Sequence, residues 1–428
     1  MPIPLINYVL SEGISGIPYF WTIIKTVPWL VALYLLKWYC GGAVNTSERN
    51  MHSKVVLMTG GTSGIGASVA RELATRGAQI VLLTQHPLTD PFLVEYIMDL
   101  RTTTNNELIT AEEVDLTSLH SVRKFATKWV DNAPPRRLDM VILCANTQTP
   151  AWGKRGVTED GIELDWGLNY VANFHLLSIL SPALRAQPPD RDVRILFGTC
   201  SSYIGGSFPE KTSKKERKAK SAPQPPTPTY KNLRPARTTS PYANSKLALM
   251  TFAQSFQKHL SSYVRPDKQP NNARILLVNP GWTRTPGMQR FLTFGSLWGL
   301  LLYIILYPLW WLLLKSADQG AQSFLYAAME AGFVLGEGGA MVKECSEVKI
   351  VRDEVSNDYV QQELWKDTET IIQQLEKEGA VRRAKEAKLA ESEKKEKEKG
   401  SEKADESGST ETANAKKAGS RRSRKAGS

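Results

Sequence analysis

The amino-acid sequence predicts an α/β fold of Rossmann type, in which helices cover both faces of a doubly wound parallel sheet. Between about residues 54 and 351, short runs rich in Val, Ile and Leu alternate with amphipathic stretches of helical length. The runs are apolar throughout, as in strands that are buried on both faces. A glycine-rich turn lies between the first run and the helix expected after it.

Five apolar runs are the clearest strands, and strands separated by helices are typical of a parallel sheet. Further strands are expected before Asp115 and near residues 340–342. The five runs are 55–58, 80–83, 140–143, 195–197 and 275–278.

We expect three parts along the 428 residues: an apolar membrane anchor at 1–50, the α/β domain at 51–378 and a low-complexity charged tail at 379–428. The tail is mainly Lys, Glu, Ala and Ser, which predicts a disordered end after at most a solvated charged helix. Within the domain, the insert 208–240 is rich in Pro, Lys and Thr and predicts a long exposed loop.

The leader contains a nearly continuous apolar run at 17–36, interrupted by Lys25. About 20 apolar residues span a bilayer, and Trp and Tyr, which gather at both ends of the run, favour its interfaces. The alternative is an apolar helix packed against the domain. No Lys or Arg occurs before Lys25, whereas the remainder is basic, so we expect the domain to face the cytosol from the endoplasmic reticulum membrane or a lipid droplet.

The net charge of +11 lies largely outside the patterned region, in the insert and in the tail. A basic chain can bind nucleic acid or an anionic membrane, but no zinc finger or aromatic–basic interleaving is present. We therefore expect a solvated basic tail and no nucleic-acid partner. The cysteines form no CxxC pair, which argues against disulfides or a structural metal and fits a reducing compartment. They are Cys40, Cys144, Cys200 and Cys345.

The glycine-rich turn reads TGGTSGIG over residues 59–66. Glycine is needed where φ is positive and where the backbone approaches a pyrophosphate, and the helix expected near Ala67 offers free N–H groups and a favourable dipole. The position between a strand and a helix strengthens this otherwise weak motif. The turn residues expected to bind a dinucleotide are Gly60, Thr62, Ser63, Gly64, Ile65 and Gly66.

The end of the second strand indicates which dinucleotide is bound. An acidic residue there would bind the ribose 2′-hydroxyl of NAD, but the sequence at 83–86 is Leu-Thr-Gln-His, without a carboxylate. NADP is favoured over NAD, because no negative charge repels its 2′-phosphate. The basic residue that often clamps this phosphate is missing from the turn, where Ser63 stands, and His86 is the candidate to assist.

Tyr242 and Lys246 are the candidate catalytic pair, since a spacing of four places both side chains on one helix face. A phenol with a pKa of about 10 is a poor acid-base catalyst at neutral pH. A lysine ammonium nearby stabilises the phenolate and lowers that pKa. YxxxK alone also occurs by chance on surface helices, but here it follows TGxxxGIG and precedes Asn-Pro-Gly at 279–281.

With these motifs in this order, residues from about 53 to 370 resemble a short-chain dehydrogenase/reductase of the retinol-dehydrogenase-like branch. The resemblance implies hydride transfer between NAD(P) and a carbonyl or alcohol. It also implies that Tyr242 is the proton donor and Lys246 its partner, which also holds the nicotinamide ribose, and that Asn169 orders a proton-relay water.

The same resemblance extends the cofactor site. It implies that Asp115 contacts the adenine ring, and that Thr285 lies near the nicotinamide carboxamide, with Thr283 beside it. The family's Asn-Asn-Ala-Gly after the fourth strand is here Leu-Cys-Ala-Asn at 143–146. Asn146 therefore stands where small residues let the cofactor approach, and we expect it to alter cofactor affinity.

The family's catalytic serine has no single counterpart. Counting from the start of the fifth strand gives Cys200, whereas counting back from Gly205 in the usual S-x-x-G spacing gives Ser202. A hydroxyl is needed to bind the substrate oxygen, so we expect Ser202 to act, with Ser201 as the second choice.

A second apolar segment, 291–314, has 24 residues without a charge, which is long enough to cross a membrane. A full crossing would place two halves of one domain on opposite sides. We therefore expect a dip that turns near Gly299 or Pro308 and serves as a lid over the substrate. The alternative is a helix buried in the core or in a homodimer interface.

Together these features predict a membrane-associated, NADP-dependent oxidoreductase that acts on a lipophilic carbonyl or alcohol, such as a retinoid, a sterol or a long-chain keto compound. The alternative is a degenerate relative that binds the cofactor as a membrane-bound sensor or scaffold. Asn146 and the long basic extensions motivate this alternative.

Overall fold

A computed structural model describes residues 19–150, 153, 155–208 and 240–422. The chain divides into two compact units, Met1–Ile372 and Gln373–Ser428. The first residues of the expected anchor, up to 18, and nearly all of the expected insert, 209–239, lie outside the described residues.

The first unit is built on one sheet of eight strands, in the order β3-β2-β1-β4-β5-β6-β7-β8. Neighbouring strands are parallel except for the last pair, β7 and β8. This confirms the doubly wound parallel sheet, including the strands expected before Asp115 and near residues 340–342. The strands are β1 (Val55–Thr59), β2 (Gln79–Thr84), β3 (Ile109–Glu113), β4 (Met140–Leu143), β5 (Val193–Gly198), β6 (Ala273–Asn279), β7 (Ala340–Lys343) and β8 (Ser346–Val348).

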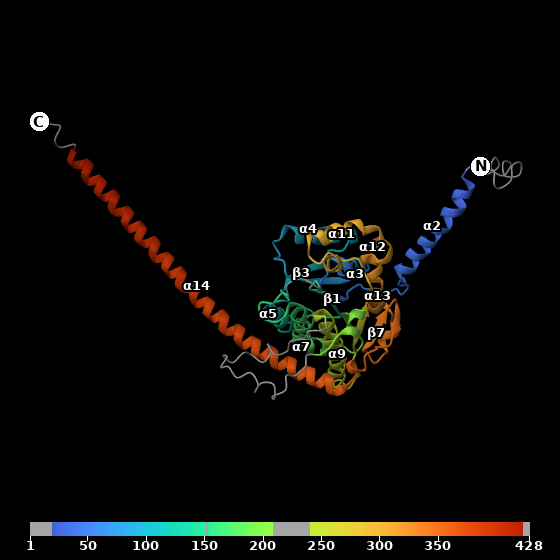
Figure 1. Ribbon diagram of the computed structural model, residues 1–428. Helices are drawn as coiled ribbons and strands as arrows, with labels where there is room; N and C mark the ends of the chain where they lie inside the picture. The colour runs from blue at the N-terminus through green and yellow to red at the C-terminus, as the bar shows by residue number, and fades with distance from the viewer. Residues whose placement is uncertain (1–18, 151–152, 154, 209–239, 423–428) are drawn as a thin grey trace, which may run out of the picture. The chain divides into compact units, whose positions relative to one another are not determined.

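Helices cover both faces of the sheet (Figure 1). On one face α3 (Gly64–Thr75) packs against α13 (Ala317–Met329), with α4 (Pro91–Thr104) beside α3. On the other, α7 (Ala172–Arg185) packs against both α5 (Leu119–Val130) and α9 (Pro241–Ser261).

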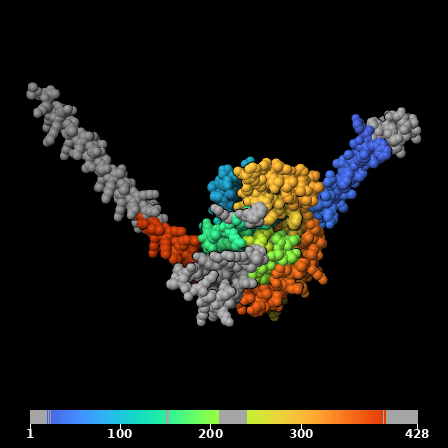
Figure 2. All heavy atoms as spheres, in the orientation of Figure 1, coloured from blue at the N-terminus to red at the C-terminus, as the bar shows by residue number. Residues whose placement is uncertain are grey.

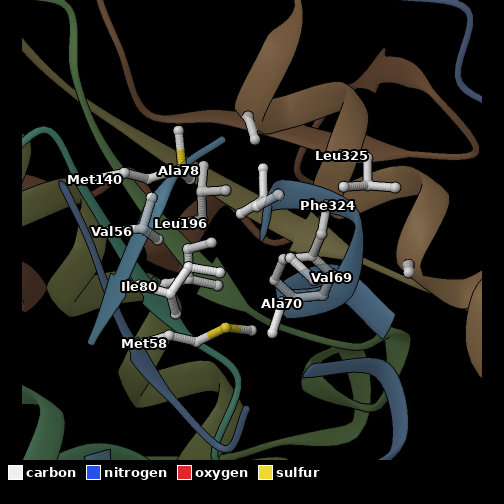
Figure 3. Close-up of a cluster of buried hydrophobic side chains, with 14 of the residues drawn as sticks. Val56, Met58, Val69, Ala70, Ala78, Ile80, Met140, Leu196, Phe324 and Leu325 are labelled. Carbon is white, nitrogen blue, oxygen red and sulfur yellow. The ribbon is translucent and has the colours of Figure 1, made fainter. Parts of the chain in front are cut away.

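The core between the sheet and α3 and α13 is formed by side chains that are almost fully removed from solvent (Figure 3). Burying one such aliphatic or aromatic side chain contributes about 1.5–3 kcal/mol to folding. This explains why the apolar runs alone were enough to predict the strands. The side chains labelled in the close-up are Val56, Met58, Val69, Ala70, Ala78, Ile80, Met140, Leu196, Phe324 and Leu325.

The described part of the leader begins with α2 (Phe20–Gly41). Lys37, near its C-terminal end, donates hydrogen bonds to the carbonyls of Trp311 at 2.5 Å and Leu314 at 3.4 Å. Beyond α2 the chain is held on the domain, because Asn45 N–H donates to Gln322 and Arg49 pairs with Asp192 at 2.7 Å. Among the described residues no single helix has both the length and the apolar character of a membrane span.

The apolar segment 291–314 is not one helix. It comprises the end of α10 (Pro286–Leu292), α11 (Leu297–Ile305) and α12 (Tyr307–Leu313). The helices α10 and α11 meet at 106°, and by length and apolar composition the bent pair could form a broken or re-entrant span. Of the two expected turn positions, Gly299 is wrong, because it lies inside α11 against the Thr293 carbonyl. The other, Pro308, lies two residues after a break at Leu306. The chain turns instead between α10 and α11 and again at Leu306.

The helix α14 (Asp358–Arg422) begins in the first unit and, in the second, is described as far as Arg422. The disorder predicted for the end of the tail is therefore wrong up to Arg422. The physical reason is composition: Ala, Glu and Lys are strong helix formers, and Glu and Lys recur at spacings that pair them along a helix.

Candidate active site

The turn between β1 and α3 has the geometry expected of a dinucleotide site. Gly60 and Gly64 have φ of 67° and 55°, in the left-handed region that favours glycine. A Cβ on Gly66 would lie 2.0 Å from the Gly60 carbonyl oxygen, and one on Gly60 would lie 2.6 Å from the Ala145 nitrogen. The helix begins at Gly64, three residues before the expected start, so its first N–H groups belong to the turn. These residues fit the diphosphate of a dinucleotide.

Two neighbours hold the turn in place. Tyr96 on α4 donates a hydrogen bond to the Gly61 carbonyl at 2.8 Å. Thr285, which caps the N-terminus of α10 by accepting from Met288 N–H, lies so close to Gly64 that a Cβ there would be 3.2 Å from its methyl carbon. The predicted cofactor turn and the predicted nicotinamide threonine are therefore adjacent in the fold.

The other predicted cofactor residues lie at the carboxyl ends of strands. Thr283 follows β6 and is buried against Gly320 of α13. Asp115, after β3, accepts hydrogen bonds from the backbone and hydroxyl of Thr117, so its carboxylate also shapes the turn before α5.

The end of β2 carries no carboxylate. Thr84 is its last residue, and its hydroxyl accepts from the His86 N–H at 3.2 Å. The His86 ring, which was expected to assist a phosphate, lies 3.3 Å from the Asp90 carboxylate. A protonated His86 would therefore already have an anionic neighbour.

Tyr242 occupies the first turn of α9, which begins with Pro241, a residue suited to the first helical position. Its hydroxyl oxygen accepts a hydrogen bond from Asn146 Nδ2 at 3.1 Å and one from the Cys200 thiol at 3.4 Å. Asn146 follows β4 and Cys200 follows β5, so three distant segments meet at one phenol.

Lys246 lies one turn later on α9 and is 3% exposed. Its ammonium donates to the Gly198 carbonyl at 2.9 Å and lies 5.6 Å from the centroid of the Tyr242 ring. Burial lowers the pKa of Lys246, an effect that the neighbouring Cys200, Cys144 and Asp165 oppose. The pair expected from the YxxxK spacing is thus assembled in one buried site.

The pKa of Tyr242 is raised well above its usual value, mainly because burial disfavours the charged phenolate. Negative charge on the Cys200 sulfur raises it further, whereas the hydrogen bond from Asn146 lowers it. The lowering of this pKa that was expected from Lys246 is therefore not found. The protonated phenol is the stable form at neutral pH, as a proton donor requires.

The two predicted serines lie on different sides of the turn after β5. Ser202 Oγ lies 2.6 Å from Cys200 Sγ, which in turn contacts Tyr242. Ser201 accepts instead from the Asn279 amide at 2.9 Å. Of these three residues, it is Cys200, the one obtained by counting from the start of the strand, that contacts the phenol.

Asn169 is fully buried in a π-helical turn, Gly167–Val171. Its amide accepts from Thr147 N–H at 2.9 Å and donates to the Thr147 carbonyl at 2.8 Å and to Ser245 Oγ at 3.1 Å. It therefore ties the loop after β4, which carries Asn146, to α9, which carries Tyr242.

Sequence reasoning expected Asn146 to affect the cofactor and missed its contact with Tyr242. The only signal was the departure from the usual glycine at this position, which showed that the site is altered but not how. Cys200 lacks the hydroxyl that is expected at the position of the family's serine.

The chain matches the family model described as short chain dehydrogenase over residues 54–195. It is 40% identical to an uncharacterised oxidoreductase, pbr1, of Schizosaccharomyces pombe, covering 91% of this chain and 100% of that protein. It is also 38% identical to an uncharacterised oxidoreductase of Saccharomyces cerevisiae, covering 90% and 95%.

More distant relatives include human Retinol dehydrogenase 13, at 27% identity over 80% of this chain and 91% of that protein. Among solved structures, an uncharacterised protein from Mycobacterium Paratuberculosis superimposes with a TM-score of 0.50 at 21% identity, covering 78% of this chain and 98% of the other. That likeness bears on the fold alone.

Proposed function

Because this chain belongs to the short-chain dehydrogenase/reductase family, we propose that it is a membrane-associated, NADP-dependent reductase of a lipophilic carbonyl compound. The family is one of NAD(P)-dependent enzymes with a Rossmann fold, and the chain is such a dehydrogenase/reductase. Family membership alone does not determine the direction of the reaction, the choice of NADP over NAD or the class of substrate, and these three points are our proposal.

The observation that carries the proposal is the arrangement around Tyr242. Its phenol lies at the carboxyl edge of the sheet with Lys246 behind it, and the cofactor turn lies at the end of β1 on the same edge. Ligands of open parallel sheets bind at this edge, so one bound dinucleotide and one substrate can both reach the phenol.

In the mechanism we propose, NADPH supplies the hydride when it is bound. Tyr242 gives its proton to the carbonyl oxygen as the hydride reaches the carbon, because its raised pKa keeps it protonated at neutral pH. Lys246, fixed by the Gly198 carbonyl, stabilises the resulting phenolate and holds the nicotinamide ribose. Ser202 orients the substrate oxygen through the polar chain that it forms with Cys200. Asn169 orders the water through which the phenol recovers its proton.

The preference for NADP over NAD is supported by the end of β2. The three residues after Leu83 are Thr, Gln and His, so none is a carboxylate, and the Thr84 hydroxyl accepts a hydrogen bond from the His86 N–H. NADP binding favours reduction, because the cytosolic pool of this cofactor is mostly in its reduced form.

The lipophilic substrate and the membrane are supported by an apolar surface on α11 and α12, which form the yellow-orange region at the top of Figure 2. These side chains are exposed in this chain, so the segment is not a core helix. The N-terminus of α10 abuts the cofactor turn through Thr285, so the segment lies where a lid over the substrate would. The exposed side chains are Leu297, Trp298, Leu300, Leu301, Leu302, Ile304, Ile305, Tyr307, Leu309, Trp311 and Leu313.

The helix α2 adds to this surface, since most of its described apolar side chains are also exposed and its end contacts α12. We propose that both segments lie in or against the cytosolic face of the endoplasmic reticulum membrane or of a lipid droplet. A lipophilic substrate then enters from the lipid, beneath the lid, without crossing water. A homodimer that covers this surface is the competing arrangement.

The test is a panel of retinal, a steroid ketone and long-chain aldehydes, assayed in mild detergent with NADPH and with NADH. The proposal predicts NADPH-dependent reduction of at least one of these and little turnover of short, water-soluble aldehydes. NADPH binding without turnover of any carbonyl or oxidation of any matching alcohol would favour the sensor or scaffold role instead.

A further inference from the structure

We propose that Asn146 is a catalytic residue: its side-chain amide donates a hydrogen bond to the phenolic oxygen of Tyr242 and stabilises the phenolate that forms when Tyr242 releases its proton. The inference rests on the proposed function for its kinetic meaning, because it assigns Tyr242 the role of proton donor. Asn146 occupies a position where this family usually has glycine, and glycine has no side chain that could donate such a bond.

The contact places a donor on the atom that changes charge. Asn146 Nδ2 lies 3.1 Å from Tyr242 Oη, within normal hydrogen-bond distance. The Cys200 thiol reaches the same oxygen at 3.4 Å. A phenolic oxygen can accept such bonds and still donate its own proton. Asn146 and Cys200 therefore leave the Tyr242 proton free for the substrate oxygen.

Asn146 is held in this position from both sides. The backbone N–H of Ala145, the residue before Asn146, donates a hydrogen bond to Thr59 Oγ1 at 3.2 Å. The following residue, Thr147, exchanges two backbone hydrogen bonds with the buried Asn169 amide, at 2.9 and 2.8 Å. Donors that are fixed before the reaction stabilise developing charge without reorganisation. In this chain Asn169 therefore serves to pre-organise the loop that aims Asn146.

The hydrogen bond from Asn146 opposes the effect of burial on the pKa of Tyr242. Burial opposes ionisation of Tyr242, and the hydrogen bond from Asn146 acts against that effect by lowering the pKa. Lys246 is held by Gly198 at the face of the ring. The amide is neutral, so it stabilises the phenolate without adding a charge that would need its own counter-ion.

The first test needs no substrate. A fluorinated tyrosine, whose phenol ionises at lower pH than tyrosine, is placed at position 242 of the full-length chain and titrated by fluorine NMR. We expect Asn146→Ala to raise the pKa of this phenol by about one unit, since a hydrogen bond to a charged group is lost. Asn146→Asp, which has the same shape but adds a negative charge, raises it further.

The matched control is Thr102→Val, which also removes one hydroxyl, here an exposed one on α4 that donates to the Met98 carbonyl at 2.8 Å. This variant leaves the phenol pKa unchanged, whereas a pKa that is unchanged in Asn146→Ala overturns the proposal. A shifted pKa in a protein that turns over no carbonyl would instead refute the proposed function and leave the hydrogen bond established, so the two failures are distinguishable.

The second test is kinetic and uses a carbonyl and alcohol pair that the wild-type protein interconverts. Asn146→Ala is expected to lower kcat on the order of tenfold with KM and NADPH affinity nearly unchanged, because the bond matters most in the transition state. Alcohol oxidation needs the phenolate, so in Asn146→Ala the acid limb of its pH–rate profile moves to higher pH by about one unit. An unchanged pH profile with a raised KM alone would show that Asn146 only shapes the cofactor site, and would overturn the inference.

Discussion

The ammonium of Lys246 bonds to the backbone carbonyl of Gly198, at 2.9 Å, and lies 5.6 Å from the centroid of the Tyr242 ring. The lysine is thereby fixed to the end of β5 and faces the ring. The groups that contact the phenolic oxygen itself are Asn146 and Cys200. Burial is the main cause of the raised pKa of Tyr242, and the hydrogen bond from Asn146 acts against it. The pH dependence of the reaction follows from this pKa.

Reduction and oxidation are expected to respond to pH in opposite ways. Burial raises the pKa of Tyr242 well above its usual value. Reduction uses the protonated phenol, so its kcat/KM stays level from about pH 6 to 9 and falls only as the pH rises through the raised pKa. Oxidation uses the phenolate, so its kcat/KM rises about tenfold per pH unit below that pKa. Initial rates in both directions check this, and a reduction rate that already falls near neutral pH would contradict it.

The cofactor turn should not tolerate a methyl group at Gly66. The new Cβ would lie 2.0 Å from the Gly60 carbonyl oxygen, and overpacking of this kind costs about 1–3 kcal/mol. We expect Gly66→Ala to lower the Tm and to weaken NADPH binding at least about tenfold, since the turn must open. Gly336→Ala is the control, because its Cβ meets nothing closer than 3.8 Å. Equal NADPH affinities for the two variants would show that the turn does not hold the diphosphate.

A carboxylate at the end of β2 should reverse the cofactor preference. Thr84→Asp keeps an acceptor for the His86 N–H and adds a negative charge beside the expected 2′-phosphate. Two unit charges about 4 Å apart interact by roughly 4 kcal/mol near a protein surface. NADPH affinity is therefore expected to fall by at least about tenfold, while NADH affinity is kept or improved. Thr84→Asn has nearly the same shape without the charge, and it should leave the ratio of the two dissociation constants close to that of the wild type.

The apolar surface of α11 and α12 should bind lipid by itself. A chain lacking residues 1–41 keeps the segment that Asn45 and Arg49 attach to the domain, and we expect it to float with phosphatidylcholine vesicles. Adding Trp298→Asp and Leu301→Asp, at side chains that are 81% and 48% exposed, should abolish flotation. The control is Val264→Asp, at an exposed site after α9. Complete release of the shortened chain would show that α2 alone attaches the protein.

The sheet could be predicted because burial on both faces leaves a direct trace in composition. The runs around Val56, Ile80 and Ile142 are apolar at every position, and each became a strand. The YxxxK pair could be predicted because four residues make about one turn of a helix, so a local spacing fixes the geometry.

What the sequence could not predict depends on contacts between distant segments or on competing local preferences. Asn146 and Tyr242 are 96 residues apart, and they meet because β4 pairs with β5 and α9 contacts the end of β5. Residues 291–314 are apolar throughout, so hydropathy alone did not reveal the break between α10 and α11. In the tail, low hydrophobicity predicted disorder, whereas local helix propensity favours the helix that α14 forms.

The central claim, that Tyr242 donates the proton in an NADPH-dependent reduction, is tested most directly by Tyr242→Phe. The substitution removes one oxygen atom and leaves the ring that faces Lys246. NADPH binding, followed by its fluorescence in the full-length chain, is expected to stay within about twofold of the wild type, while kcat for the best carbonyl substrate falls by about 10²–10⁴-fold. A variant that binds NADPH and reduces the carbonyl at the wild-type rate would contradict the account.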